Sequence, residues 1–126
     1  MRFLMATTRK NEWSDLVRGL QTAASTTPVW ATSGAAALQA IRDQSFDLIL
    51  IDESLPDMPG LDLAEQLIKI NPMLNCAVAS SLSAEAFHEA SEGLGLLAQM
   101  PLEPNAQVAL ELVERVAAIE KLTRGA

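Results

Sequence analysis

The sequence lacks any apolar run near the roughly 18 residues that a membrane-spanning helix requires. Its first ten residues contain too short an apolar segment before the polar residues to form a secretory signal. Its single cysteine, Cys76, cannot form an internal disulfide. These three absences predict a cytoplasmic protein that does not span a membrane.

Basic residues are also scarce. Nine lysines and arginines stand against 16 acids, which gives a formal net charge of -7 and a pI near 4.5. A protein that binds the backbone of a nucleic acid needs a basic face, so direct binding to nucleic acid is not expected. Five of the nine basic residues nevertheless lie in the first third of the chain, namely Arg2, Arg9, Lys10, Arg18 and Arg42.

Groups suited to catalysis are few. His88 is the only histidine, and we expect it to be a solvated helix residue because no second ligand type stands at a useful spacing. Ser80, Ser81 and Ser83 would need a histidine within reach and an orienting acid to act as nucleophiles. Cys76 lies in an apolar strand and is expected to be an inert core thiol. There is no glycine-rich phosphate loop and no acid/base pair, so an enzyme is not expected.

The chain is organised around residues 46–60, FDLILIDESLPDMPG. The apolar run Phe46–Ile51 is too continuous for a half-exposed strand and predicts a buried central strand of a parallel sheet. Asp52 then stands at the carboxyl edge of that sheet, where open α/β folds keep their ligand sites. The prolines and glycine within residues 56–60 predict a loop beside Asp52 and a helix from about Leu61. An isolated acid at a strand end more often caps a helix or loop, and both interpretations stay open here.

Strand and helix alternate five times along residues 1–126, without a repeat or linker, so one domain is expected. The predicted strands are Arg2–Ala6, Val29–Ala31, Phe46–Ile51, Cys76–Ala79 and Leu96–Gln99, with Met100 and Pro101 in the exit loop of the last. The predicted helices run from a cap at Asn11 to about Ala24, from Ser33 or Gly34 through Ile41, from Leu61 to Ile70, from Ala84 to about Glu92, and from Pro104 to about Leu122. Such alternation implies a doubly wound α/β fold with a five-stranded parallel sheet, right-handed crossovers and helices on both faces.

The spacing of Asp52, Pro56 and Gly60 behind a strand resembles the motif of CheY-like response-regulator receiver domains, whose fold is flavodoxin-like. The similarity covers nearly the whole chain, and it is also carried by Gly34, Ala37 and Leu38 in the second helix, by Phe46, Asp47 and Leu48 entering the third strand, and by Pro101 after the fifth. The resemblance implies the strand order 2-1-3-4-5, flanked by five helices. It also implies that Asp52 is the phospho-acceptor of a bacterial two-component (phosphorelay) system.

If the acid pair is counted as one position, three of the family's five functional positions are altered in this chain. Thr7 and Thr8 stand where the family has the acid pair that holds magnesium. Met100 stands in place of the lysine that contacts the phosphoryl group. Leu97 stands at the position of the aromatic switch residue, whereas Ser80 keeps the hydroxyl that ends the fourth strand.

These changes predict a nearly neutral pocket without a metal ion or other cofactor. Magnesium is usually bound by one or two carboxylates together with waters and phosphate, and Asp52 is expected to be the only carboxylate in the pocket. Losing two acids also removes the need for a lysine at Met100. Arg9 and Lys10 leave the first strand beside the pocket and could supply a cation, although a solvated loop is the simpler interpretation.

The leading hypothesis is a degenerate receiver domain, or pseudoreceiver, which acts as a protein interaction module independently of phosphorylation. Its expected partners are a histidine kinase, an output domain, or a second copy bound through the fourth helix, fifth strand and last helix. The alternative is a working phospho-acceptor, in which Asp52 takes a phosphoryl group from a histidine kinase and a partner or a basic loop replaces the missing acids.

Overall fold

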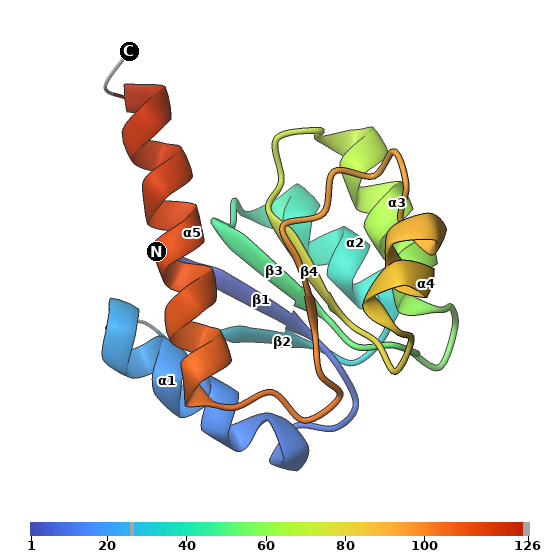
Figure 1. Ribbon diagram of the computed structural model, residues 1–126, viewed down its shortest axis with the longest axis horizontal. Coiled ribbons are helices and arrows are strands. Elements are labelled where there is room, and N and C mark those ends of the chain that lie inside the picture. The colour runs from blue at the N-terminus through green and yellow to red at the C-terminus, as the bar shows by residue number, and fades with distance from the viewer. Residues whose placement is uncertain (26, 125–126) are drawn as a thin grey trace.

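The computed structural model describes residues 1–25 and 27–124, and Figure 1 shows the arrangement of its helices and strands. Its sheet contains β1 (Phe3–Ala6), β2 (Val29–Ala31), β3 (Leu48–Ile51), β4 (Cys76–Ala79) and β5 (Ala98–Met100). All neighbouring strands are parallel and their order is β2-β1-β3-β4-β5. The predicted doubly wound sheet and its strand order are confirmed.

Helices cover both faces of the sheet. They are α1 (Ser14–Ala24), α2 (Gly34–Asp43), α3 (Gly60–Ile70), α4 (Ala84–Ala90) and α5 (Ala106–Arg124), and a short 3-10 turn, η1 (Asn11–Trp13), precedes α1. In Figure 1, α1 and α5 lie together on one face and α2 and α3 lie on the other. A Cβ atom at Gly19 of α1 would stand only 2.8 Å from Ala109 Cβ of α5, so a glycine is needed for this close helix contact.

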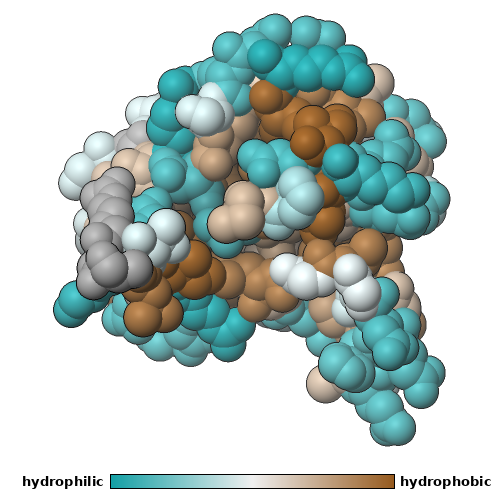
Figure 2. All heavy atoms as spheres, turned by 90° about the horizontal axis from the view of Figure 1, so that it is seen from above, coloured by the Kyte–Doolittle hydropathy of each residue, from teal (hydrophilic) through white to brown (hydrophobic). Residues whose placement is uncertain are grey.

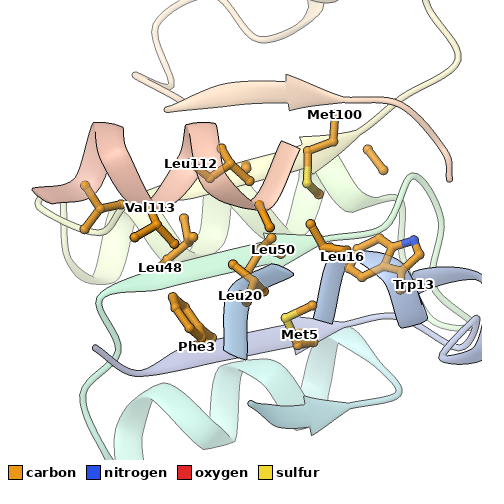
Figure 3. Packing of buried hydrophobic residues seen from close by; sticks show 14 residues of the cluster. Phe3, Met5, Trp13, Leu16, Leu20, Leu48, Leu50, Met100, Leu112 and Val113 are labelled. Atoms are coloured by element: carbon orange, nitrogen blue, oxygen red, sulfur yellow. The ribbon is translucent and has the colours of Figure 1, made fainter. Parts of the chain in front are cut away.

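The two central strands are buried on both faces, which explains their continuous apolar runs. Phe3 and Leu48 point into a cluster with α1 and α5, which is drawn in Figure 3. Leu4 and Ile49, their neighbours along the strands, point into a second cluster against α2 and α3. Side chains alternate between the faces of a strand, so one apolar run fills both cores. Burying each large side chain contributes about 1.5–3 kcal/mol.

Two predicted helix starts were wrong. Asn11 opens the 3-10 turn η1, and α1 begins at Ser14 without a side-chain cap. The last helix begins at Ala106, two residues after Pro104, because Asn105 Oδ1 accepts a hydrogen bond of 3.1 Å from the backbone N–H of Val108. An asparagine side chain satisfies one of the free N–H groups in a first helical turn, and this cap sets the start of α5.

The fifth strand is displaced from its predicted position. It covers Ala98–Met100, whereas Leu96–Gln99 was predicted. Gly93 and Gly95 have φ angles of 85° and 65°, which favour glycine and keep the preceding chain in turns. Met100 is therefore the last residue of the strand and does not lie in the exit loop. The strands Val29–Ala31 and Cys76–Ala79 match the prediction, and the remaining helix and strand boundaries agree with it to within two residues.

The outer surface mixes polar and apolar side chains. On the face in Figure 2, hydrophobic residues form separate patches between hydrophilic ones. Large side chains such as Ile70 and Met73 are exposed, which is normal when they are scattered. Within the described residues, every helix is too short or too polar to cross a membrane.

Candidate functional site

Three of the residues singled out in the sequence meet at the carboxyl edge of the sheet. Thr7 follows β1, Asp52 follows β3 and Ser80 follows β4, and they are 1%, 3% and 8% exposed. The backbone N–H of Asp52 donates to the carbonyl of Ala6 at 2.8 Å, and that of Ser80 donates to the carbonyl of Met100 at 3.0 Å. The sheet ladder therefore continues into the site and fixes the backbone of both residues.

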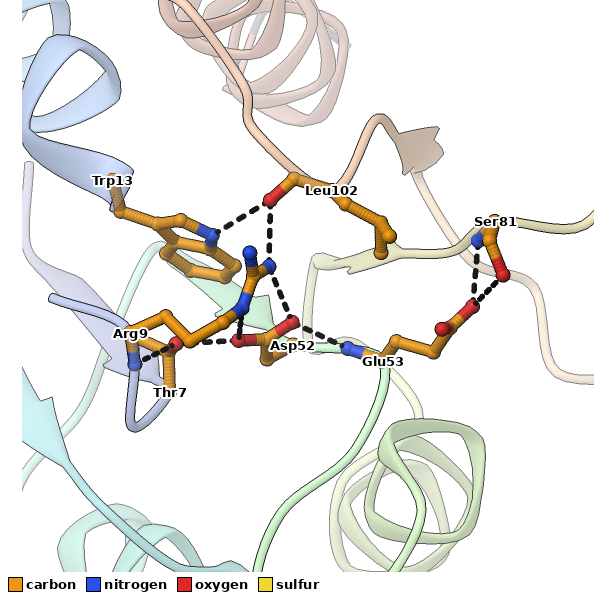
Figure 4. A network of polar contacts seen from close by, with 7 residues as sticks. All are labelled: Thr7, Arg9, Trp13, Asp52, Glu53, Ser81 and Leu102. Carbon is orange, nitrogen blue, oxygen red and sulfur yellow. Dashed lines mark hydrogen bonds and ion pairs between the residues drawn. The ribbon is translucent and has the colours of Figure 1, made fainter. Parts of the chain in front are cut away.

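Each of the two carboxylate oxygens of Asp52 accepts two hydrogen bonds. Thr7 Oγ1 donates to Oδ2 at 2.6 Å, and Arg9 Nε donates to the same oxygen at 2.9 Å. Arg9 Nη2 and the backbone N–H of Glu53 donate to Oδ1 at 2.9 and 2.8 Å. An ionised carboxylate has about four lone-pair sites, so these four donors use its full capacity. Figure 4 shows this network.

Arg9 links Asp52 to the loop between β5 and α5. Its Nη2 also donates to the carbonyl of Leu102 at 2.6 Å, and Trp13 Nε1 donates to that carbonyl at 3.2 Å. The hydrogen bond to Asp52 raises the pKa of Arg9, so the guanidinium stays charged. The solvated-loop interpretation was wrong for Arg9. Lys10 instead lies over the ring of Trp30, with its Nζ 4.9 Å from the ring centroid.

The remaining residues predicted for the pocket differ in their exposure to solvent. Met100 is 1% exposed and packs in the core cluster with α1 and α5, so its side chain is a core residue and does not line the pocket as expected. Thr8 and Pro101 are exposed. Leu97 is half-buried before β5, and its carbonyl accepts a hydrogen bond of 2.8 Å from Arg115 Nη1.

Glu53 is a second acid at this edge of the sheet, and the sequence analysis missed it. Its Oε2 accepts hydrogen bonds from the backbone N–H and the Oγ of Ser81, at 2.6 and 2.8 Å. These bonds lower the pKa of Glu53. The carboxylate of Glu53 is turned toward Ser81 and away from the carboxylate of Asp52 (Figure 4). The sequence signal that could have found Glu53 is its position directly after Asp52, at the end of β3.

The loop that follows Asp52 is anchored at its far end. Asp57 accepts hydrogen bonds from the N–H groups of Gly34 and Ala35 at the start of α2, at 2.8 and 3.0 Å, which lower the pKa of Asp57. A Cβ atom at Gly60 would overlap the carbonyl oxygen of Asp52, so only glycine allows α3 to begin this close to the strand end. Asp57 and Gly60 therefore fix where this loop meets α2 and α3.

Two other reactive side chains lie apart from the site. Cys76 is fully buried in β4, and burial raises the pKa of its thiol to about 12, so it is a core residue. His88 is exposed on α4. Among residues 1–25 and 27–124, no three histidine, cysteine or acidic side chains come together in a way that could hold a metal ion.

The sequence model of the response regulator receiver domain matches residues 5–100, which is more than half of the chain. The chain belongs to this family. It is a receiver domain of the kind found in two-component systems.

Individual relatives agree with this assignment. The chain is 36% identical over 64 residues to the aerobic respiration control sensor protein ArcB of Escherichia coli K12, a match that covers 51% of this chain and 8% of ArcB. It is 29% identical over 56 residues to the chemotaxis protein CheY of Thermotoga maritima, covering 44% of this chain and 47% of that protein. The chain therefore spans less than half the length of either relative in these matches.

Solved structures confirm the fold. A CheY-like receiver domain protein from Methanospirillum hungatei JF-1 superposes with a TM-score of 0.81 at 23% identity, over 95% of this chain and 96% of that one. A likeness at this level of identity concerns the fold, and the chemistry of the site has to be argued from its own residues.

The residues of this receiver domain do not fit the magnesium ion that the family implies. Magnesium prefers an octahedral shell of oxygen ligands, usually with one or two carboxylates. Here the carboxylate of Asp52 already accepts hydrogen bonds from the guanidinium of Arg9, the hydroxyl of Thr7 and the backbone N–H of Glu53. One oxygen of the Glu53 carboxylate, Oε2, accepts both hydrogen bonds from Ser81.

Proposed function

We propose that this receiver domain is a protein interaction module that works without phosphorylation, in the cytoplasm and without enzymatic activity of its own. The observation that supports this proposal is the saturated carboxylate of Asp52. Four donors occupy its two oxygens, and two of them belong to the planar guanidinium of Arg9. Paired Arg–carboxylate bonds of this kind are among the stronger and geometrically more specific hydrogen bonds in proteins.

The chemistry of phosphoryl transfer supports the same proposal. A carboxylate that takes a phosphoryl group needs a free oxygen to attack phosphorus, and the transferring oxygens need cations that neutralise their charge. In this site the nearest cation, Arg9, already neutralises Asp52 itself. Phosphorylation would have to break two charged hydrogen bonds before it could form a new one, and magnesium binding should be weak or absent.

The alternative, a working phospho-acceptor, is favoured by one observation. Arg9 is a cation from the basic loop after β1, and its side chain is 31% exposed, so it could turn from Asp52 to an incoming phosphoryl group. Against this, the same guanidinium also bonds Leu102, and Thr7 Oγ1 still occupies Oδ2.

The proposed partner surface is the side formed by α4, β5 and α5. A groove of about 340 Å³ lies between α4 and β5, and Phe87 and Leu96 contribute apolar surface to it. Leu97 lies beside this groove in sequence and is half-buried. We propose that the groove and Leu97 receive a protein partner, such as a histidine kinase, an output domain or a second copy, and that the domain does not contact nucleic acid directly.

The experiment is incubation with acetyl phosphate and magnesium, followed by intact mass spectrometry. The wild type should keep its mass, as the Asp52→Asn variant does, while a receiver domain with an intact acid pair gains one phosphoryl group under the same conditions. A phosphoryl adduct on the wild type that disappears in Asp52→Asn would establish the phospho-acceptor instead.

A further inference from the structure

The loop between β4 and α4 presents two donors to a single oxygen of Glu53. The backbone N–H and the Oγ of Ser81 lie 2.6 and 2.8 Å from Glu53 Oε2, across a separation of 28 residues (Figure 4). Two convergent donors, one of them a backbone N–H, form the kind of concave arrangement that binds an anion. Here the anion is part of the chain.

Further hydrogen bonds, one within the loop and one from β5, hold the rest of this loop. The backbone N–H of Leu82 donates to Ser80 Oγ at 3.1 Å, so the hydroxyl oxygen of Ser80 turns back into the loop. Gln99 Nε2 donates to the carbonyl of Leu82 at 2.8 Å. The loop is therefore held from the β3 side by Glu53 and from the β5 side by Gln99. These contacts precede Ser83, whose side chain caps α4.

We propose that Glu53 is a built-in anionic ligand of the β4–α4 loop, which occupies the backbone N–H and the hydroxyl of Ser81 that a free anion would otherwise bind. The inference rests on the proposed function and deepens it, because it names the group that occupies the donors of this loop when no phosphoryl group is added. Arg9 neutralises Asp52, and Glu53 occupies the loop donors. A ligand tethered to the chain acts at an effective concentration in the millimolar range or above, which free anions in solution seldom match.

This arrangement has a consequence for the partner surface. The β4–α4 loop leads directly into α4, and α4 supplies Ala84, Phe87 and His88 to the groove against β5. Glu53 therefore fixes the chain at Ser81, three residues before α4 begins. A free anion could shift the loop only by binding it differently in two states, and Glu53 already holds the donors.

The test compares Glu53→Ala with Glu89→Ala, which removes an exposed glutamate from α4. The readout is the backbone amide of Ser81, followed by its NMR resonance and its hydrogen exchange. Hydrogen bonds to charged groups are worth enough that exchange of this amide should become about tenfold faster in Glu53→Ala. It should stay unchanged in Glu89→Ala. Glu53→Gln, which keeps an oxygen acceptor of the same shape, should lie between the wild type and Glu53→Ala.

Chemical rescue separates an anionic ligand from a merely structural side chain. Adding sodium formate to Glu53→Ala should return the Ser81 resonance toward its wild-type position, whereas sodium chloride at the same ionic strength should not. An unchanged Ser81 amide in Glu53→Ala, or equal effects of formate and chloride, overturns the proposal. Phosphorylation of the wild type by acetyl phosphate would contradict the proposed function and leave the response of Ser81 to Glu53→Ala unaltered, so the two failures are distinguishable.

Discussion

Arg9 and Asp52 face each other as a two-bond fork, with Nε to Oδ2 and Nη2 to Oδ1 both at 2.9 Å. The two residues are 43 positions apart and come from the loops after β1 and β3. The same guanidinium reaches the carbonyl of Leu102, so one side chain connects three loops at the carboxyl edge of the sheet. These hydrogen bonds hold the three loops together around the carboxylate of Asp52.

Magnesium should not stabilise the wild-type protein. A ligand that binds the folded state with a dissociation constant of about 1 mM would add about 1.4 kcal/mol at about 10 mM, enough for a clear rise in melting temperature. Because Arg9 occupies the carboxylate of Asp52, we expect no such rise. The variant Thr7→Asp/Thr8→Asp/Arg9→Ala should gain one. Thermal melting of both proteins with and without magnesium checks this. Saturable binding of magnesium by the wild type would count against a nearly neutral pocket that binds no metal ion.

Gly60→Ala should be strongly destabilising. Its Cβ would overlap the carbonyl oxygen of Asp52. The sheet holds the backbone of Asp52, and Gly60 is the first residue of α3, so neither can easily move away. We expect a loss of about 3 kcal/mol or more in the free energy of unfolding. Gly93→Ala is the matched control, since its Cβ would meet open space and its φ of 85° alone should cost about 1 kcal/mol. Urea denaturation measures the free energy of unfolding of both variants. Equal losses would refute the claim that a Cβ at position 60 clashes with the carbonyl of Asp52.

The stability of the domain should fall on acidification through Glu53 and Asp57. Donors on Ser81 and at the start of α2 hold the pKa values of these two carboxyls below their ordinary 4.5 and 3.8, although the neighbouring charge of Asp52 opposes the shift of Glu53. A carboxyl with a lowered folded pKa contributes stability above its unfolded pKa, and this contribution is lost as the pH falls through the folded value.

The loss should therefore begin below about pH 4.5 and be smaller in Glu53→Gln, which cannot titrate at this position. Urea unfolding of the two proteins at about pH 7 and about pH 3 gives the comparison. Both carboxyls are near solvent, so the difference should be modest. An identical dependence on pH in the two proteins would show that the contact of Glu53 with Ser81 does not stabilise the fold.

Association through the α4, β5 and α5 side should depend on Leu97 and hardly on the charge of Asp52. Leu97→Glu would place a charge in a contact that excludes water and should weaken association clearly. Asp52→Asn should change the affinity by less than tenfold, or about 1.4 kcal/mol. Sedimentation of the three proteins over a range of concentrations measures this. A monomer at every concentration contradicts the homodimer, and a large loss with Asp52→Asn alone favours regulation by phosphorylation.

The sequence predicted the fold well because its strongest signals are local. The run Phe46–Ile51, the turn residues after it and the alternation of strands and helices each report on a few neighbouring positions. The start of α5 was missed because a capping asparagine and a helix-opening proline stand side by side, and only the geometry shows that Asn105 provides the cap. The last strand was misplaced because Leu96 and Leu97 extend its apolar pattern into a turn.

The site was predicted less completely than the fold, for a different reason. The positions of Asp52, Thr7 and Ser80 follow from strand ends, which the sequence locates. The pairing of Arg9 with Asp52 depends on the direction of a long side chain in space. The contact of Glu53 with Ser81 similarly joins two strand ends, and it becomes visible only when both loops are placed.

The measurement that tests the account most directly is a double-mutant cycle on the Arg9–Asp52 pair. Arg9→Met, Asp52→Asn and the double variant should give a coupling free energy of about 1–3 kcal/mol by urea unfolding, because the carboxylate is buried and the contact has two bonds. The exposed pair of Asp15 and Arg18 on α1 is the control, with about 0.5 kcal/mol or less expected. A coupling of Arg9 with Asp52 no larger than that of the control pair would contradict the central claim that Arg9 holds the carboxylate of Asp52.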